Sequence, residues 1–243
     1  MTNMALLNNI EHHDLRVISG HGPEYGDSIN LTPVFPTEFA EAQRDYPILF
    51  RKGEDGQYSA VALLGLDKGE NLFLTNEGWQ GRYIPAIHQR GPFVIGRQNQ
   101  EIDGETRQEP VIFVDLEDSR VSRSDGHPLF LKHGGNSPYL QHVSHVLRVI
   151  NKGAEIARPM FAAFEAAELI EPASLEIRLD EHTVYNVPDI YSINEQKLAA
   201  LEGATLENLH KSGFLRAAYL VLASLPNVSR LISLKNAKRA HDS

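Results

Sequence analysis

The sequence predicts an α+β protein, with a β-rich part carrying short helices over residues 1–135. A mainly helical part with one β-hairpin follows over residues 136–243. Short apolar runs separated by Gly, Pro and Asp turns dominate the first part. Sustained helical periodicity begins at Ser137 and Pro138. The 243 residues, 42% of them hydrophobic, suffice for one large domain or two small ones, so the two parts can also pack as one unit.

The first part opens with a short helix and a hairpin. The stretch PTEFAEAQRDY (36–46) predicts the helix, because proline suits a first helical turn and Phe39 and Ala42 share one face. Two strand-like runs, ILFRK (48–52) and YSAVALLGL (58–66), flank the turn GEDG and predict the hairpin. Further strands are expected at LRVIS (15–19), ENLFLT (70–75), FVIG (93–96) and EPVIFVDL (109–116). The apolar run in the last of these is typical of a strand buried on both faces.

The second part begins where Ser137 and Pro138 form an N-cap and first-turn pair. Gly153 and Pro159 predict a kink or interruption in the helix that follows. The runs SLEIRL and HTVYNV predict a hairpin across Asp180 and Glu181. A capping box is expected at Ser192-x-x-Glu195, before a short helix. Two further helical stretches are divided at Pro226, after a helix that Gly213 closes.

The glycine-rich stretch from Val61 to Ala86 predicts turns between short strands. A phosphate-binding loop needs G-x-x-x-x-G-K-[ST] between a strand and a helix, and this order of residues is absent. Asp67-Lys68-Gly69 instead suits a tight turn between two apolar runs. A helix is expected to open between Trp79 and Ala86.

Composition excludes several classes of function. The net charge of −9 argues against nucleic-acid binding, which needs a surplus of Lys and Arg. Without cysteine there are no disulfides, thiolate metal sites or cysteine nucleophiles. The N-terminal residues have no basic region followed by a long apolar run, and Arg216, Pro226 and Arg230 interrupt the most apolar stretch. We therefore expect a cytoplasmic protein without a transmembrane segment.

Two pairs of residues suggest a metal site. His12-x-Asp14 resembles half of a site with two histidines and one carboxylate that binds iron. Asp115 and Glu117 end a strand and face the same side of it. The alternative interpretation is a surface terminus and a solvated strand end, and the sequence favours it for both pairs. His142 and His145 share a helix face, but the sequence supplies no evident third ligand.

The stretch WQGRYIPAIHQRGPF is the sequence's best candidate for a binding surface. It interleaves aromatic side chains with arginines, a composition that can stack on a ligand or a partner. The residues concerned are Trp79, Arg82, Tyr83, His88 and Arg90. The alternative is a short helix anchored by Tyr83 and its apolar neighbours. No nucleophile elbow, dinucleotide fingerprint or other catalytic motif is present, so the sequence leans away from an enzyme without deciding the matter.

In order along the chain, HHDLRV, FPTEFAEAQRDYPILF, VALLGLDKGENLFL, RYIPA and LASLPNVSRL are similar to motifs of the SapC family. The resemblance covers most of the chain, from about residue 14 to 234. It implies a non-enzymatic accessory or binding protein, without a cofactor, associated with surface-layer, export or uptake systems. It also leaves open an iron- and 2-oxoglutarate-type oxygenase, a peptide-modifying enzyme, or a protein partner of a flavin-dependent halogenase-like enzyme. The oligomeric state stays open, and the resemblance supplies no catalytic residues.

Overall fold

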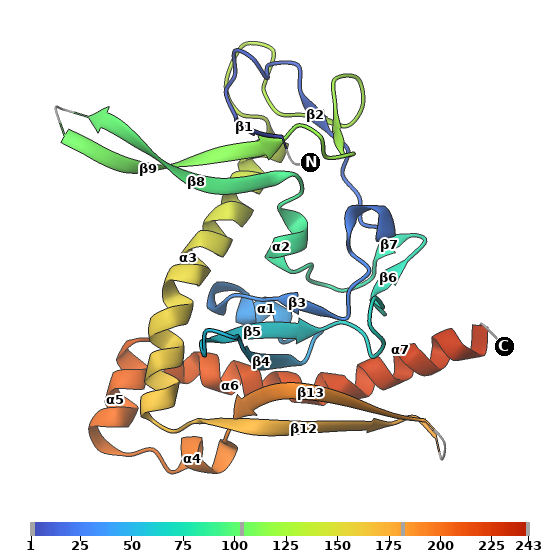
Figure 1. Ribbon diagram of the computed structural model, residues 1–243, viewed down its shortest axis with the longest axis vertical. Coiled ribbons are helices and arrows are strands. Elements are labelled where there is room, and N and C mark those ends of the chain that lie inside the picture. The colour runs from blue at the N-terminus through green and yellow to red at the C-terminus, as the bar shows by residue number, and fades with distance from the viewer. Residues whose placement is uncertain (1–2, 103–104, 181–182, 242–243) are drawn as a thin grey trace. The chain divides into compact units, whose positions relative to one another are not determined.

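The computed structural model describes residues 3–102, 105–180 and 183–241, which form two compact units (Figure 1). Unit 1 runs to His21 and resumes at Ala86–Asn151. Unit 2 comprises Gly22–Pro85 and the chain from Lys152 onward. Each unit is therefore built from two separate stretches of sequence. The division into parts 1–135 and 136–243 stays a prediction.

The predicted succession of a β-rich part and a helical part is wrong. The chain has a mixed fold, with 37% helix and 28% strand, and its strands are spread along the sequence. The C-terminal hairpin was expected to stand among helices. Instead it extends a sheet begun by the first third of the chain, through the pair Tyr191 and Phe50. Such long-range pairing depends on tertiary packing, which local patterns do not report.

Unit 1 contains a three-stranded antiparallel sheet in the order β1-β9-β8. Its strands are β1 (Met4–Leu6), β8 (Phe93–Ile102) and β9 (Glu105–Asp115). A second, smaller sheet has the order β10-β2-β11. It consists of β2 (Arg16–Val17), β10 (Val121–Ser122) and β11 (His127–Pro128). A single-turn helix, α2 (Ala86–Gln89), precedes β8.

One edge of β9 is covered over only part of its length. β1 pairs with Phe113–Asp115, and the backbone N–H of Leu7 donates to the Ile112 carbonyl at 2.8 Å. The Asp115 N–H points toward β8, where it donates to the Pro92 carbonyl. Backbone groups of successive residues in a strand point to opposite edges, so those of Ile112 and Pro110 point away from β8, toward the edge that β1 partly covers. Pro110, which has no N–H, therefore lies where the described part of the sheet has no further strand.

The first half of α3 (Pro138–Ala166) covers the sheet of unit 1. The helix begins as predicted, because the Ser137 hydroxyl accepts the Leu140 N–H at 3.1 Å. The buried core of unit 1 consists of Leu15, Val17, Phe93, Val114, Leu129, Leu140, Val143 and Leu147. Three of these residues come from α3 at helical spacing, so its apolar stripe closes this core.

Unit 2 is built on a five-stranded antiparallel sheet in the order β12-β13-β4-β5-β3. Its strands are β3 (Leu31–Pro33), β4 (Ile48–Lys52), β5 (Tyr58–Leu63), β12 (Ile170–Arg178) and β13 (Val184–Ile193). Both hairpins predicted from the sequence, β4-β5 and β12-β13, are confirmed. The turn of the second one includes Glu181 and His182, which lie outside the described residues. A two-stranded ribbon joins β6 (Leu74–Thr75) to β7 (Gly78–Trp79).

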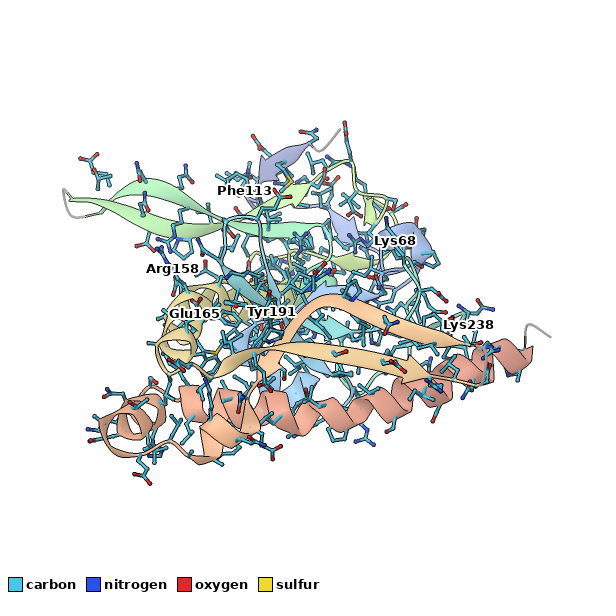
Figure 2. The ribbon with its side chains drawn as sticks, turned by 60° about the horizontal axis from the view of Figure 1, so that its bottom comes forward. Lys68, Phe113, Arg158, Glu165, Tyr191 and Lys238 are labelled. Carbon is cyan, nitrogen blue, oxygen red and sulfur yellow. The ribbon has the colours of Figure 1, made fainter. Side chains whose placement is uncertain are left out.

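Helices cover this sheet and complete unit 2. Two short ones, η2 (Pro36–Glu38) and α1 (Phe39–Ala42), fall within the predicted first helix. The others are η1 (Pro23–Tyr25), α4 (Glu195–Ala199), α5 (Gly203–Lys211), α6 (Phe214–Ser224), η3 (Leu225–Asn227), α7 (Val228–His241) and the second half of α3. Within unit 2, α7 runs alongside the β12-β13 hairpin (Figures 1 and 2). Arg239 of α7 bonds Asp180 beyond the end of β12 at 2.7 Å.

Two local predictions about these helices are wrong. Helix α3 continues through Gly153 and Pro159, so the predicted interruption is absent, while the alternative of a kink stays a prediction. Packing requires glycine at position 153, because a Cβ there would lie 2.4 Å from the Cβ of Phe35. The expected capping box at Ser192 does not form, because Ser192 belongs to β13 and Asn194 caps α4 by accepting the Lys197 N–H at 2.8 Å.

The helical stretch Phe214–His241 is, within the described residues, the single stretch long and apolar enough to cross a membrane by length and composition. One such stretch is weak evidence of a membrane span, because a core helix of a globular protein meets the same criteria of length and composition. Here the stretch contributes Ala218, Val221 and Leu231 to the core of unit 2.

Candidate functional site

The stretch that follows β7 is held against α1 by aromatic hydroxyl groups. The indole N–H of Trp79 donates to the Tyr46 hydroxyl at 2.8 Å, and that hydroxyl donates to the Tyr83 carbonyl. The Tyr83 hydroxyl in turn donates to Glu38 Oε2 at 2.7 Å. Gly81 lies against Tyr46, and all of these groups belong to unit 2. The aromatic side chains therefore fix a loop to the core.

Asp45 is the charged centre of the same network and is fully buried. Its Oδ2 accepts the backbone N–H groups of Arg82 at 2.7 Å and Tyr83 at 3.1 Å. Its Oδ1 forms an ion pair with Arg230 of α7, whose guanidinium lies 5.1 Å from the Phe73 ring centre. These N–H groups were expected to begin a helix between Trp79 and Ala86. They bond Asp45 instead, and α2 begins only at Ala86.

The structure places the predicted binding residues in different environments. Trp79 and Tyr83 are half-buried in the network described above, whereas Arg82 is exposed. His88 and Arg90 belong to unit 1, where both are half-buried. Arg90 donates to the Phe93 carbonyl at 2.9 Å. A contact role for these five residues stays a prediction, but Trp79 and Tyr83 have a structural task of their own.

Burial also raises the pKa of several tyrosines. It raises the pKa of Tyr46 above its ordinary value of 10.0, against the hydrogen bond from Trp79, which lowers it. Burial and the neighbouring Glu38 carboxylate raise the pKa of Tyr83. In unit 1, burial raises the pKa of Tyr139 to about 12. Above pH 10 the unfolded chain therefore loses protons that the folded chain keeps, so the free energy of unfolding falls as pH rises.

We expect the folded protein to form fewer tyrosinates between pH 10 and about 12 than the same protein in concentrated urea. The measurement is a pH titration of the folded and of the unfolded chain, followed by the ultraviolet absorbance of tyrosinate. The chain has eight tyrosines in total, which sets the full amplitude. Tyr83→Phe removes one of the late-ionising groups and should narrow the difference. Coincident titrations of the folded and unfolded chains would contradict the buried environments described here.

A second network attaches α7 to the glycine-rich turn. Lys235 is buried, and its ammonium group bonds Glu70 at 2.7 Å and also Asp67. Glu70 Oε2 accepts the N–H groups of Leu66 and Asp67, both at 3.3 Å. The turn itself is as predicted, with the Glu70 N–H donating to the Asp67 carbonyl at 3.1 Å.

The turn also explains Gly65. A Cβ at this position would lie 2.2 Å from the Glu70 carbonyl oxygen, so only glycine lets the chain close around Glu70. The glycine-rich turn, which resembles a functional loop in the sequence, thus serves to hold α7 of the same chain.

The four candidate metal ligands have other partners in unit 1. His12 is buried and its Nδ1 accepts the Asn8 N–H at 3.1 Å, while Asp14 pairs with Arg123. Asp115 Oδ1 accepts the backbone N–H groups of Asn3 at 2.9 Å and Glu117 at 3.1 Å. Among the described residues, no group of three or more His, Asp and Glu side chains is placed to hold a metal ion. A metal-binding role for the four stays a prediction.

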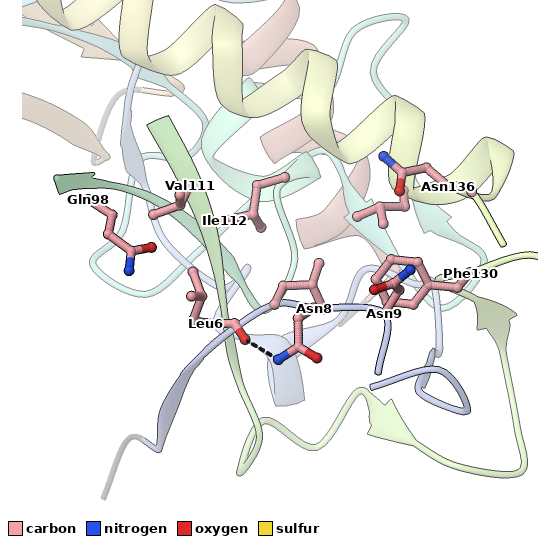
Figure 3. A pocket seen from close by; sticks show the side chains of 11 residues that line it. Leu6, Asn8, Asn9, Gln98, Val111, Ile112, Phe130 and Asn136 are labelled. Carbon is pink, nitrogen blue, oxygen red and sulfur yellow. Dashed lines mark hydrogen bonds between the residues drawn. The ribbon is translucent and has the colours of Figure 1, made fainter. Parts of the chain in front are cut away.

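The feature of unit 1 best suited to binding is a groove made of two adjoining hollows, each of about 430 Å³. The first lies along β9 where β1 ends. Figure 3 shows Phe130, Asn9 and Asn136 gathered at one end of it, and Gln98 and Val111 at the other. Its apolar lining is Leu6, Leu7, Val111, Ile112, Phe130 and Leu140, and its amide lining is Asn8, Asn9, Gln98 and Asn136.

The second hollow lies between the sheet and α3. The sheet contributes Ile95, Pro110 and Ile112, and α3 contributes Gln141, Ser144, Leu147 and Arg148. Ile112 and Asn136 line both hollows, so the two adjoin at these residues. Its volume is in the range of sites for small ligands, which are concave, mostly apolar and carry a few polar groups.

Among the described residues that line the groove, none is suited to acid–base or nucleophilic chemistry at neutral pH, apart from the unactivated hydroxyl of Ser144. That hydroxyl donates to the Leu140 carbonyl at 2.7 Å, within its own helix. The lining is aliphatic, aromatic and carboxamide, with one guanidinium. This arrangement can bury apolar atoms and bond amide groups, so it fits binding better than catalysis.

Sequence reasoning missed the groove. Its lining comes from six short stretches between Leu6 and Arg148, each with an ordinary composition. One signal pointed to it: a proline inside an apolar strand, which marks an unpaired edge. The strand predicted at EPVIFVDL as a central one is the middle strand of its sheet, but β1 covers it only at Phe113–Asp115.

The fold and groove together define a mixed α/β protein whose groove in unit 1 is suited to binding a partly apolar ligand. A family model described as SapC matches residues 7–231. The chain belongs to the SapC family, which confirms the resemblance found in its sequence motifs. No curated protein and no solved structure matches the chain.

Proposed function

We propose that this chain is a non-enzymatic binding protein that holds a short, extended peptide segment in the groove of unit 1. The observation that carries the proposal is the lining, in which aliphatic and carboxamide side chains surround a stretch of the β9 edge that β1 leaves uncovered. Membership of the SapC family supports an accessory role in a surface-layer, export or uptake system, which is the setting that the sequence motifs imply.

A peptide fits this groove for two reasons. Carboxamide side chains both donate and accept hydrogen bonds, as peptide groups do. The exposed edge of β9 offers backbone groups to an added strand, and peptides in extended conformation bind sheet edges in this way. Pro110 limits the stretch of edge that can pair, so the ligand is short.

The proposal is tested with a mixed-sequence library of N-acetylated, C-amidated pentapeptides and a chain labelled at its Ile, Leu and Val methyl groups. We expect the library to shift the methyl resonances of Leu6, Val111 and Ile112, and to leave those of Ile48 in unit 2 unchanged. Ile112→Glu places a charge in the groove and should abolish the shifts.

The matched control is Ile18→Glu, which changes a partly exposed aliphatic residue of unit 1 outside the groove and should preserve the shifts. Far-ultraviolet circular dichroism establishes that both variants are folded. If the library leaves the methyl groups of the groove unshifted in the wild-type chain, the proposal is wrong.

A further inference from the structure

We infer that the groove takes the C-terminal end of its peptide, with the terminal carboxylate bound by Arg148. This rests on the proposed function and specifies the class of ligand. The proposal comes from the second hollow, which the sheet and α3 line together and where the character of the lining changes. The first hollow is lined by uncharged residues, and the second adds one charged residue.

Arg148 is that charged residue. It lies on α3, one residue beyond Leu147, whose side chain is buried in the core. Among the described residues its guanidinium has no ion pair and no hydrogen bond. An arginine in this state can offer both of its parallel N–H donors to a carboxylate, the geometry for which guanidinium is best suited.

The neighbouring polar groups match the last peptide unit of such a ligand. The Ser144 hydroxyl donates its proton to the Leu140 carbonyl, so toward the groove its oxygen can only accept a hydrogen bond. Gln141 donates from Nε2 to the Asn136 carbonyl at 3.1 Å, which leaves its oxygen as the acceptor. The oxygens of Ser144 and Gln141 can therefore accept the last peptide N–H of the ligand, while the Arg148 guanidinium binds the terminal carboxylate that follows it.

Charge complementarity and position favour the end of a chain over its middle. Arg148 is the last groove residue along α3, so a segment entering from the first hollow meets its charge after passing Ile112 and Asn136. The apolar side chains of the segment then face Ile95 and Leu147, and its charged terminus faces solvent and Arg148.

The test compares three pentapeptide libraries by methyl titration. One is C-amidated without Asp or Glu, one ends in a free carboxylate, and one is amidated but ends in Asp. We expect the free carboxylate to lower the apparent Kd about tenfold relative to the amide, as a charge-assisted bidentate pair does. Arg148→Gln should abolish that gain, and Arg148→Lys should keep part of it.

Arg158→Gln is the matched control, since Arg158 is exposed on the same helix but belongs to unit 2. It should keep the full gain. Equal binding of the amidated and free-carboxylate libraries would overturn the role of Arg148 and leave the proposed function intact. A gain that survives in Arg148→Gln would do the same. If the Asp-ended library binds as tightly as the free carboxylate, the assignment to a chain terminus is wrong. Failure of all three libraries would reject the proposed function itself.

Discussion

Replacing Asp45 with alanine is expected to lower the free energy of unfolding by about 3 kcal/mol, the cost of leaving buried partners of a charge unpaired. The measurement is urea denaturation followed by the fluorescence of Trp79, the single tryptophan of the chain. Trp79 is a suitable reporter because its indole N–H bonds Tyr46, the residue next to Asp45.

The size of this effect follows from what Asp45 bonds. Its carboxylate is fully buried and accepts two backbone N–H groups in addition to the ion pair with Arg230. The Arg230 side chain is 36% exposed, so in the alanine variant water compensates part of the ion pair that Arg230 loses. The N–H groups of Arg82 and Tyr83 lose their acceptor, and with it the loop loses its attachment to the end of α1.

Two variants separate the charge from the hydrogen bonds. Asp45→Asn keeps one oxygen as an acceptor and should cost about half as much as the alanine variant. Asp14→Ala removes a carboxylate from an exposed ion pair with Arg123, and should leave the free energy of unfolding almost unchanged because solvent screens such pairs. If Asp45→Ala is as mild as Asp14→Ala, the network around Tyr46 does not support the loop.

The hairpins were predictable because their signals are local. In ILFRK-GEDG-YSAVAL the alternation, the turn and the strand lengths agree, and residues 48–52 and 58–63 pair as expected. The β8-β9 hairpin was predicted only at its two apolar ends. Its outer residues, 97–102 and 105–109, are mostly polar and resemble a loop, yet they pair in one continuous register. A strand exposed on both faces lacks the alternation that reveals strands in a sequence.

The candidate site was less predictable than the fold. The stretches that identify the family hold together unit 2: Asp45, Trp79 and Tyr83 in one network, and Glu70 in the other. Their conspicuous residue types arise from buried hydrogen bonds, which local sequence does not distinguish from a binding surface. The groove has the opposite character, with ordinary residues brought together from distant positions, so tertiary structure alone reveals it.

The second large effect is expected at Lys235. We expect Lys235→Met to lower the free energy of unfolding by about 3 kcal/mol, since it leaves the buried Glu70 carboxylate with a weaker set of partners. Lys238 still bonds Glu70 at 3.0 Å, but its own side chain is 52% exposed. Lys238→Ala should therefore cost less than about 1 kcal/mol, which makes it the matched control on the same helix.

A double-mutant cycle identifies the cause of that loss. Glu70→Gln keeps an oxygen for the N–H groups of Leu66 and Asp67 but removes the charge that Lys235 neutralises. The double variant Lys235→Met with Glu70→Gln should then be more stable than the sum of the single effects predicts, by about 1–2 kcal/mol. Strict additivity would show that Lys235 acts through Asp67 or through the Tyr185 ring, 5.6 Å from its ammonium group, and not through Glu70.

The same network gives the stability a defined dependence on pH. Burial alone would raise the pKa of Glu70, but the hydrogen bonds from Lys235 and Lys238 outweigh it and hold the pKa below its ordinary value of 4.5. The stabilisation is therefore complete above pH 4.5 and is lost as pH falls through the lowered pKa. Acid denaturation of Glu70→Gln should lack this component. Since the carboxylate anchors the C-terminal half of α7 to the glycine-rich turn, we expect this half to be released first, as a loss of helical circular dichroism before the Trp79 fluorescence changes.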